Sequence, residues 1–180
     1  KILIAFDGDT AGKKAAIRTG YTLLRNSVNP KIISLPENLD PDDWVEKEGP
    51  DKFLSSSKQA ISVINFHYNY YKSEEDESIN EFIDESINEI ILIKEPIFRE
   101  LTAKYLSELV NVNEENILAS LNNKISKKKD EKESNSSSSE SEWTTSDDNK
   151  LLALYKRNVP EIALTCTKHL GNLVIPLSLI

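Results

Sequence analysis

A short apolar run that ends in two aspartates constrains the fold of this chain more than any other feature. Residues 2–6 are all apolar and lead directly into Asp7, Gly8 and Asp9. Such a run is typical of a strand that is buried on both faces, as in a parallel sheet. Helical spacing of apolar side chains follows from Thr10, the predicted N-cap, to Asn26, and residues 31–35 are predicted to form a second strand that Pro36 ends. The sequence therefore predicts a parallel strand, helix and strand unit of the α/β class.

Both predicted strands end in aspartates. Asp7 and Asp9 follow the first strand, and Asp40, Asp42 and Asp43 follow the second after a short loop. The carboxyl ends of parallel strands lie at the same edge of a sheet, so these side chains should form an acidic pocket. Clustered carboxylates raise one another's pKa, and a hard divalent cation stabilises their ionised forms. The two motifs together predict a site for Mg²⁺ or Mn²⁺, although each motif alone also fits a turn or a helix cap.

Two glycines and two lysines lie beside the first pair of aspartates. Gly8 permits a tight turn, and Gly12 permits a close approach near the helix start, where free amide groups could face a phosphate. Lys13 and Lys14 could bind that nucleotide phosphate. Lysines in the first turns of a helix are, however, more often solvated surface.

The rest of the chain predicts helices and then a linker. In residues 58–125, apolar side chains recur at helical spacing in three stretches, the last of them after Pro96. His67 and its neighbouring tyrosines could stack on bases, but the acidity of this region favours plain core packing. Residues 126–150 are rich in lysine, serine and acidic residues, which predicts a disordered linker. Residues 151–180 begin as an apolar helix and end in an apolar tail without helical spacing.

Composition excludes several classes of protein. The chain has 180 residues and a net charge of −8, with no basic stripe of the kind that binds a phosphate backbone. No apolar stretch is long enough to span a membrane, so we expect no membrane partner. The single cysteine, Cys166, excludes an internal disulfide and fits a reducing, cytoplasmic location.

The order of these motifs resembles the second half of the Toprim domain in bacterial DnaG-type primases. The resemblance rests on FDGDTAGKKAA at residues 6–16, Leu-Pro at 35–36, DPDDWV at 40–45 and EGPDKF at 48–53. It implies a partial Toprim parallel-sheet unit in residues 1–57 and an all-α primase subdomain in residues 58–125. Residues 126–150 would then be a flexible linker, and residues 151–180 the truncated start of a helicase-binding domain.

The resemblance also implies a site and an activity. Asp7 and Asp9 would be the catalytic metal ligands, and Asp40 and Asp42 would complete the metal site. The activity would be that of a DNA primase, which is a DNA-directed RNA polymerase of the primosome. Such an enzyme makes short RNA primers for DNA replication by metal-dependent nucleotidyl transfer. Its partners would be a single-stranded DNA template, ribonucleoside triphosphates and, through the C-terminal region, the replicative DNA helicase.

Some parts of the family pattern precede the point where this chain starts. They are a zinc-binding domain, a basic template-holding subdomain and the Toprim glutamate, so a zinc ion is expected only in that preceding domain. We therefore expect that the isolated chain binds Mg²⁺ or Mn²⁺ weakly and makes no primers.

Two alternative functions remain open at this point. A haloacid-dehalogenase-like phosphatase also has a strand that ends in Asp-x-Asp, but that family has Thr or Val where this chain has Ala11. The second alternative is a non-catalytic fragment that docks on a helicase.

Overall fold

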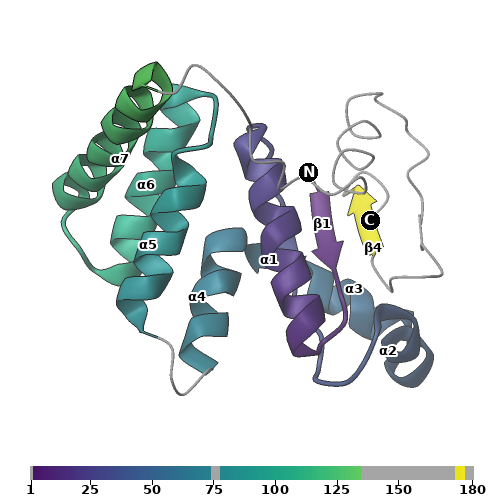
Figure 1. The fold of residues 1–180 in the computed structure, drawn as a ribbon. Coiled ribbons are helices and arrows are strands. Elements are labelled where there is room, and N and C mark those ends of the chain that lie inside the picture. The colour runs from purple at the N-terminus through teal and green to yellow at the C-terminus, as the bar shows by residue number, and fades with distance from the viewer. Residues whose placement is uncertain (1, 74–77, 135–172, 177–180) are drawn as a thin grey trace.

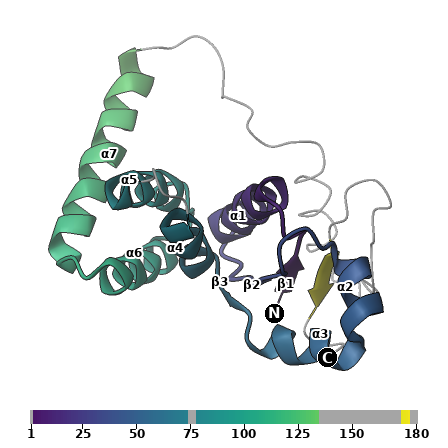
Figure 2. The ribbon, with the colours of Figure 1, turned by 90° about the horizontal axis from the view of Figure 1, so that it is seen from below.

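The structure, a computed structural model, describes residues 2–73, 78–134 and 173–176. Its four-stranded sheet has the order β3-β2-β1-β4 (Figures 1 and 2). Strands β1 (Ile2–Ala5) and β2 (Lys31–Ile33) are parallel, with Ile4 opposite Ile32. The predicted parallel unit is confirmed, although the second strand ends at Ile33, two residues before its predicted end at Leu35.

Two short antiparallel strands flank this unit. Strand β3 (Ile61–Ser62) pairs with β2, and β4 (Leu173–Pro176) pairs with the other edge of β1. The helix predicted at the start of residues 151–180 lies outside the described ranges, whereas residues 173–176 of the predicted apolar tail form a strand. Its Leu-Val-Ile sequence suits a strand, and pairing satisfies backbone groups on an edge of β1. The other residues of this segment lie outside the described ranges.

Helix α1 (Thr10–Arg25) packs on one face of the sheet (Figure 1). Its N-cap is Asp9, so the prediction of Thr10 as the cap was wrong by one residue. The Asp9 carboxylate accepts a hydrogen bond from the Gly12 amide, whereas Thr10 already lies in the first turn. The helix ends at Arg25, immediately before Asn26, as predicted.

Helices α2 (Pro41–Glu48) and α3 (Pro50–Lys58) pack on the opposite face. Because side chains alternate along a strand, Ile4 joins the core beneath α1, and Leu3 joins a second cluster with Trp44 and Phe53. The Trp44 and Phe53 rings meet edge to face, with centroids 5.8 Å apart. The sheet is therefore buried on both faces, as its apolar first strand predicted.

A helical region follows the sheet in the chain. It consists of α4 (Val63–Ser73), α5 (Ile79–Ile90), α6 (Pro96–Val110) and α7 (Glu114–Ser134), which pack side by side (Figure 2). The three predicted helical stretches are confirmed, and α6 begins at Pro96, where a proline fits the first helical turn. Helix α7 extends past residue 126, the predicted start of the linker, to Ser134. Lysine and glutamate, which have high helix propensity, predominate in residues 127–134. Residues 135–150 of the predicted linker lie outside the described ranges.

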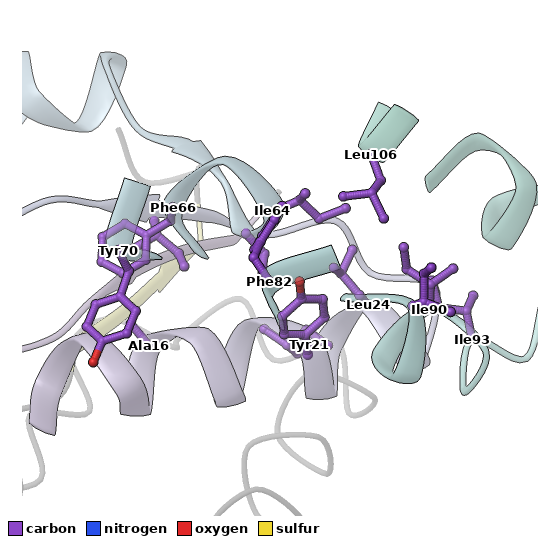
Figure 3. Close-up of a cluster of buried hydrophobic side chains, with 14 of the residues drawn as sticks. Ala16, Tyr21, Leu24, Ile64, Phe66, Tyr70, Phe82, Ile90, Ile93 and Leu106 are labelled. Carbon is purple, nitrogen blue, oxygen red and sulfur yellow. The ribbon is translucent and has the colours of Figure 1, made fainter. Parts of the chain in front are cut away.

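The sheet and the helical region share one hydrophobic core. Figure 3 shows Ala16, Tyr21 and Leu24 of α1 facing side chains of α4, α5 and α6, among them Phe82 and Leu106. Phe82, Ile90 and Leu106 are fully buried. The domain boundary between residues 57 and 58 stays a prediction; it falls in the last turn of α3, and the hydrophobic core includes residues on both sides of it. Among the described residues, no helix is long and apolar enough to cross a membrane.

Candidate metal-binding site

A backbone hydrogen bond joins the loops that follow β1 and β2. The Gly8 amide donates a hydrogen bond to the Leu39 carbonyl, with an N to O distance of 2.9 Å. A Cβ atom at position 8 would collide with the carbonyl oxygen of Pro36, so only glycine fits here. This contact draws the segment around Asp7 and Asp9 toward the segment that precedes Asp40, at the carboxyl edge of the two parallel strands.

Asp9 is held by the start of α1. Its Oδ1 atom accepts a hydrogen bond of 2.6 Å from the Gly12 amide, and its carbonyl accepts one of 2.9 Å from the Lys13 amide. Gly12 is buried against Asp7, and a Cβ atom at position 12 would meet the Asp7 backbone. The close approach that the sequence predicted at Gly12 is therefore confirmed.

Asp40 is held in the same way by the start of α2. Its Oδ1 atom accepts a hydrogen bond of 2.7 Å from the Asp43 amide, and Pro41 occupies the first helical position. Asp42 and Asp43 are exposed in the first turn, where a negative charge stabilises the helix dipole. Helix capping, the structural alternative to metal binding that the sequence left open, is thus present at Asp9 and at Asp40.

Asp7 differs from these two capping aspartates. It is partly buried, and its Oδ1 atom is buried with no hydrogen-bond partner in the part of the chain that the structure describes. Burial raises the pKa of Asp7, and the nearby carboxylates of Asp9 and Asp40 raise it further. A buried carboxylate oxygen without a donor is costly unless a cation or a proton occupies the space beside it. The donor set of Asp7 therefore fits a hard divalent cation.

The structure brings only part of the predicted ligand set together. Asp7 lies within electrostatic reach of Asp9 and Asp40, whereas Asp42 is exposed on α2. Across residues 2–73, 78–134 and 173–176, no three His, Cys, Asp or Glu side chains are close enough to enclose a metal ion. The assignment of Asp7, Asp9, Asp40 and Asp42 as metal ligands therefore stays a prediction.

The two lysines have protein partners. Lys13 Nζ lies 3.6 Å from Glu37 Oε1, and Lys14 Nζ lies 5.9 Å from the centre of the Tyr70 ring. Lys13 is half-buried, and the Glu37 side chain is 80% exposed, so their ion pair is weak and leaves Lys13 available to an anion.

A cavity of about 200 Å³ opens beside Asp7. Its walls come from the start of α1, from residues 32–35 and from α4, which contributes Phe66, Asn69 and Tyr70. Asp7 and Lys13 both line it, so one acidic and one basic group face an otherwise largely apolar space. Sequence reasoning missed the α4 wall because helical spacing identifies buried faces and does not show which distant elements they meet.

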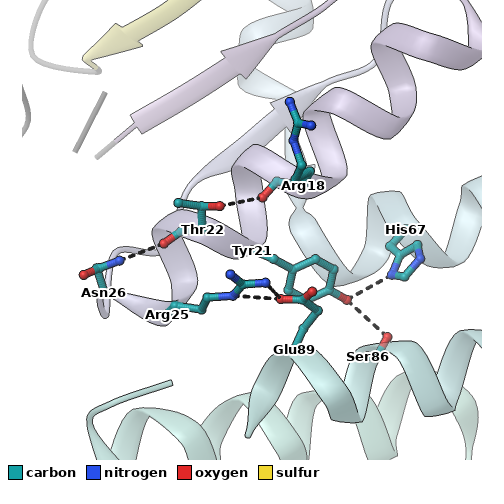
Figure 4. A network of polar contacts seen from close by, with 8 residues as sticks. All are labelled: Arg18, Tyr21, Thr22, Arg25, Asn26, His67, Ser86 and Glu89. Carbon is teal, nitrogen blue, oxygen red and sulfur yellow. Dashed lines mark hydrogen bonds and ion pairs between the residues drawn. The ribbon is translucent and has the colours of Figure 1, made fainter. Parts of the chain in front are cut away.

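A buried polar network joins α1 to the helical region (Figure 4). Tyr21 Oη lies 3.0 Å from His67 Nδ1 and 3.1 Å from Ser86 Oγ. Burial lowers the pKa of His67 to about 4, although Glu85 Oε2 lies 3.5 Å from Nε2. We attribute this to the exposure of Glu85, which lets solvent screen its charge. His67 also packs edge to face with Tyr21, Tyr71 and Phe82, so the prediction of plain core packing is confirmed.

An ion pair extends this junction toward the end of α1. Arg25 Nε and Nη2 donate hydrogen bonds of 2.9 and 2.5 Å to Glu89 Oε2, and both side chains are partly buried. This contact and the Tyr21 network tie α1, whose N-cap is Asp9, to α4 and α5 (Figure 4).

Comparison with known sequences identifies related proteins. Residues 1–45 match a family described as Toprim-like. The chain is 30% identical over 132 residues to a DNA primase of Clostridium acetobutylicum, an alignment that covers 71% of this chain and 22% of that protein. It is also 30% identical over 125 residues to a DNA primase of Staphylococcus epidermidis, covering 67% of this chain and 21% of that protein. The chain thus spans about a fifth of the length of these relatives.

Comparison with solved structures gives the same family. A DNA primase domain from Pseudomonas aeruginosa aligns with a TM-score of 0.52 and 31% identity, over 64% of this chain and 38% of that domain. The zinc-binding and RNA polymerase domains of the Aquifex aeolicus primase align with a TM-score of 0.52 and 22% identity, over 65% of this chain and 28% of that one. The second likeness concerns the fold alone. These relatives favour the primase interpretation of the Asp-Gly-Asp strand end over the phosphatase alternative.

Proposed function

We propose, on the premise that this chain belongs to the bacterial DnaG-type DNA primases, that its first 57 residues supply part of the metal-binding site for primer synthesis. The proposed activity of the whole protein is DNA-directed RNA synthesis of short primers for DNA replication. The substrates would be ribonucleoside triphosphates on a single-stranded DNA template.

The observation that carries this proposal is the state of Asp7. Its buried Oδ1 atom, which has no hydrogen-bond partner among the described residues, lies at the carboxyl edge of two parallel strands, where ligands of α/β proteins bind. The carboxylates of Asp9 and Asp40 raise the Asp7 pKa by repulsion, and a divalent cation bound between these groups would offset that repulsion. The similarity to Toprim-like proteins covers the same residues.

The residues would act as follows. Asp7, Asp9 and Asp40, with Asp42 at the rim, would hold Mg²⁺ or Mn²⁺. Bound there, such an ion neutralises phosphate charge and increases the acidity of an attacking hydroxyl group. Lys13, which lines the adjoining cavity, would attract the triphosphate of the nucleotide, and Lys14 would add to the positive potential.

The remaining partners follow from family membership alone. The relatives are DNA primases, and we propose a cytoplasmic site of action and contact with the replicative helicase through the C-terminal region. Zinc would bind only in a zinc-binding domain of the kind named in the Aquifex aeolicus structure. Template binding would depend on such additional parts, because this chain carries a net charge of −8.

A chimeric enzyme tests the proposed activity. Residues 1–125 would replace the corresponding segment of the Staphylococcus epidermidis primase, and primer synthesis would be measured on single-stranded DNA. We expect synthesis by the chimera and a loss on the order of a hundredfold or more when Asp7 is changed to Asn, since a metal ligand is removed. Glu100→Gln, an exposed carboxylate of α6 in the helical region, serves as the control. A folded chimera whose synthesis does not depend on Asp7 would refute the proposed role.

A further inference from the structure

The three central aspartates use their carboxylate oxygens differently. Asp9 and Asp40 each commit Oδ1 to a short hydrogen bond with a helix amide, at 2.6 and 2.7 Å. Within the described ranges, Asp7 has no such bond at its buried Oδ1. The two capping aspartates therefore have only Oδ2 wholly available for a cation, whereas Asp7 can offer its buried Oδ1.

The caps also fix where these carboxylates lie. An N-cap side chain is held by the first turn of its helix, and α1 and α2 are anchored by burial of Ala16 and Trp44 in separate clusters. Gly12 lets α1 begin against the Asp7 backbone, and the hydrogen bond from Gly8 to Leu39 joins the two loops. The positions of Asp9 and Asp40 are thus set by protein contacts that require no metal.

We propose that Asp9 and Asp40 are positioning residues whose helix caps preform the metal-binding edge, with Asp7 as the principal ligand and Asp9 and Asp40 contributing at most one oxygen each. This inference rests on the proposed metal-binding function and deepens it. It assigns to the first turns of α1 and α2 the task of holding two negative charges beside Asp7 before a cation arrives.

Two substitutions at one position separate the cap from the charge. Asp9→Asn keeps an oxygen that can cap α1 and removes the charge, whereas Asp9→Ala removes both. The whole chain is studied in EDTA and then with Mn²⁺. In EDTA we expect Asp9→Ala to lower the unfolding midpoint by about 5 °C and to increase the exchange rate of the Gly12 amide at least tenfold. Asp9→Asn should change the unfolding midpoint and the Gly12 exchange rate by only a small fraction of the changes in Asp9→Ala.

The Mn²⁺ titration, followed by electron paramagnetic resonance, tests the positioning role. Both variants should bind Mn²⁺ more weakly than the wild type, and Asp9→Ala should be weaker than Asp9→Asn by about threefold or more, because it also frees the helix start. Asp51→Ala is the matched control, since Asp51 is an exposed first-turn aspartate of α3, a helix without a side-chain cap.

The outcomes are distinguishable. If Asp9→Ala and the wild type have equal unfolding midpoints and equal exchange rates of the Gly12 amide in EDTA, the claim that the Asp9 side chain stabilises the start of α1 is refuted. If Asp9→Ala lowers the unfolding midpoint but binds Mn²⁺ as strongly as Asp9→Asn, the positioning role is refuted. The proposal of metal binding is not affected by that result. A wild-type chain that binds no Mn²⁺ would refute the proposed function itself, whatever the midpoints in EDTA.

Discussion

At the scale of single residues, Asp7 is the carboxyl group at the sheet edge whose ionised form is disfavoured by its surroundings. Burial and two neighbouring carboxylates raise its pKa, so its ionised form destabilises the folded chain at neutral pH when no cation is bound. Asp7→Asn should therefore raise the unfolding midpoint in EDTA and abolish the additional stabilisation that Mn²⁺ gives the wild type. Thermal unfolding with and without Mn²⁺ measures both effects. A lower unfolding midpoint for Asp7→Asn than for the wild type in EDTA would contradict the claim that ionised Asp7 destabilises the folded chain.

His67 gives a pH-dependent prediction. Its pKa is about 4 in the folded chain and 6.5 ordinarily, so between these values the unfolded chain binds a proton that the folded chain does not. Stability should therefore be complete above pH 6.5 and fall as the pH is lowered toward 4, by about 3 kcal/mol at most. The difference between the wild type and His67→Gln in urea unfolding isolates this contribution from other titrating groups. Parallel stability curves for the two proteins across this range would disprove the assignment.

Residue identity predicted where the acidic groups would gather, but it did not predict how each oxygen is used. Aspartate is common both at N-caps and at metal sites, so the sequence alone could not separate Asp7 from Asp9. The difference arises because Gly12 is the third residue of α1 and lies beside Asp9, while the Asp7 Oδ1 atom is buried and meets no donor in residues 2–73, 78–134 and 173–176.

At the scale of elements, the contact between α1 and α4 depends on a glycine. A Cβ atom at Gly20 would come within 2.6 Å of Val63 Cγ2, which forces the two helices apart. A glycine to alanine change within a helix ordinarily stabilises it by roughly 0.5–1 kcal/mol, whereas overpacking costs about 1–3 kcal/mol. We expect Gly20→Ala to destabilise the chain by about 1–2 kcal/mol in urea unfolding. Adding Val63→Ala should cost less in this background than in the wild type, and simple additivity would contradict the steric explanation.

The hydroxyl group of Tyr21 links three helices. Tyr21→Phe would leave His67 Nδ1 and Ser86 Oγ without their buried partner, at a cost of about 1–3 kcal/mol. Tyr105→Phe is the control, because its hydroxyl group meets Ser62 at the exposed surface. Chemical denaturation should show a clear loss for Tyr21→Phe and a change within about 0.5 kcal/mol for Tyr105→Phe. Similar losses in both variants would remove the case for a network at the junction.

Helical periodicity predicted most elements, and tertiary contacts account for the differences. The spacing of apolar side chains located α1 and the helices from α4 to α6, since each buries one face. The pairing of β4 with β1 depends on a distant neighbour, which local composition does not contain.

At the scale of the whole molecule, one core connects the sheet edge to the helical region. Ile4 and Ile32 of the sheet belong to the same buried cluster as Phe82 and Leu106. Residues 2–125 should therefore unfold in a single cooperative step, even though the resemblance divides them at residue 57. Hydrogen exchange that protects the Ile4 and Leu106 amides to the same extent would agree with this, and a large difference in protection would indicate two independent units.

The most direct test of the central claim is line broadening by Mn²⁺ in amide NMR spectra of this chain. A divalent cation held at the carboxyl edge of β1 and β2 should selectively broaden the Gly8 and Asp40 amides in the wild type and not in Asp7→Asn. The exposed acidic residues Glu81, Asp84 and Glu85 of α5 provide an internal reference for non-specific binding. Broadening that is equal at α5 and at the sheet edge, or unchanged by Asp7→Asn, would contradict the claim that this edge is a metal site.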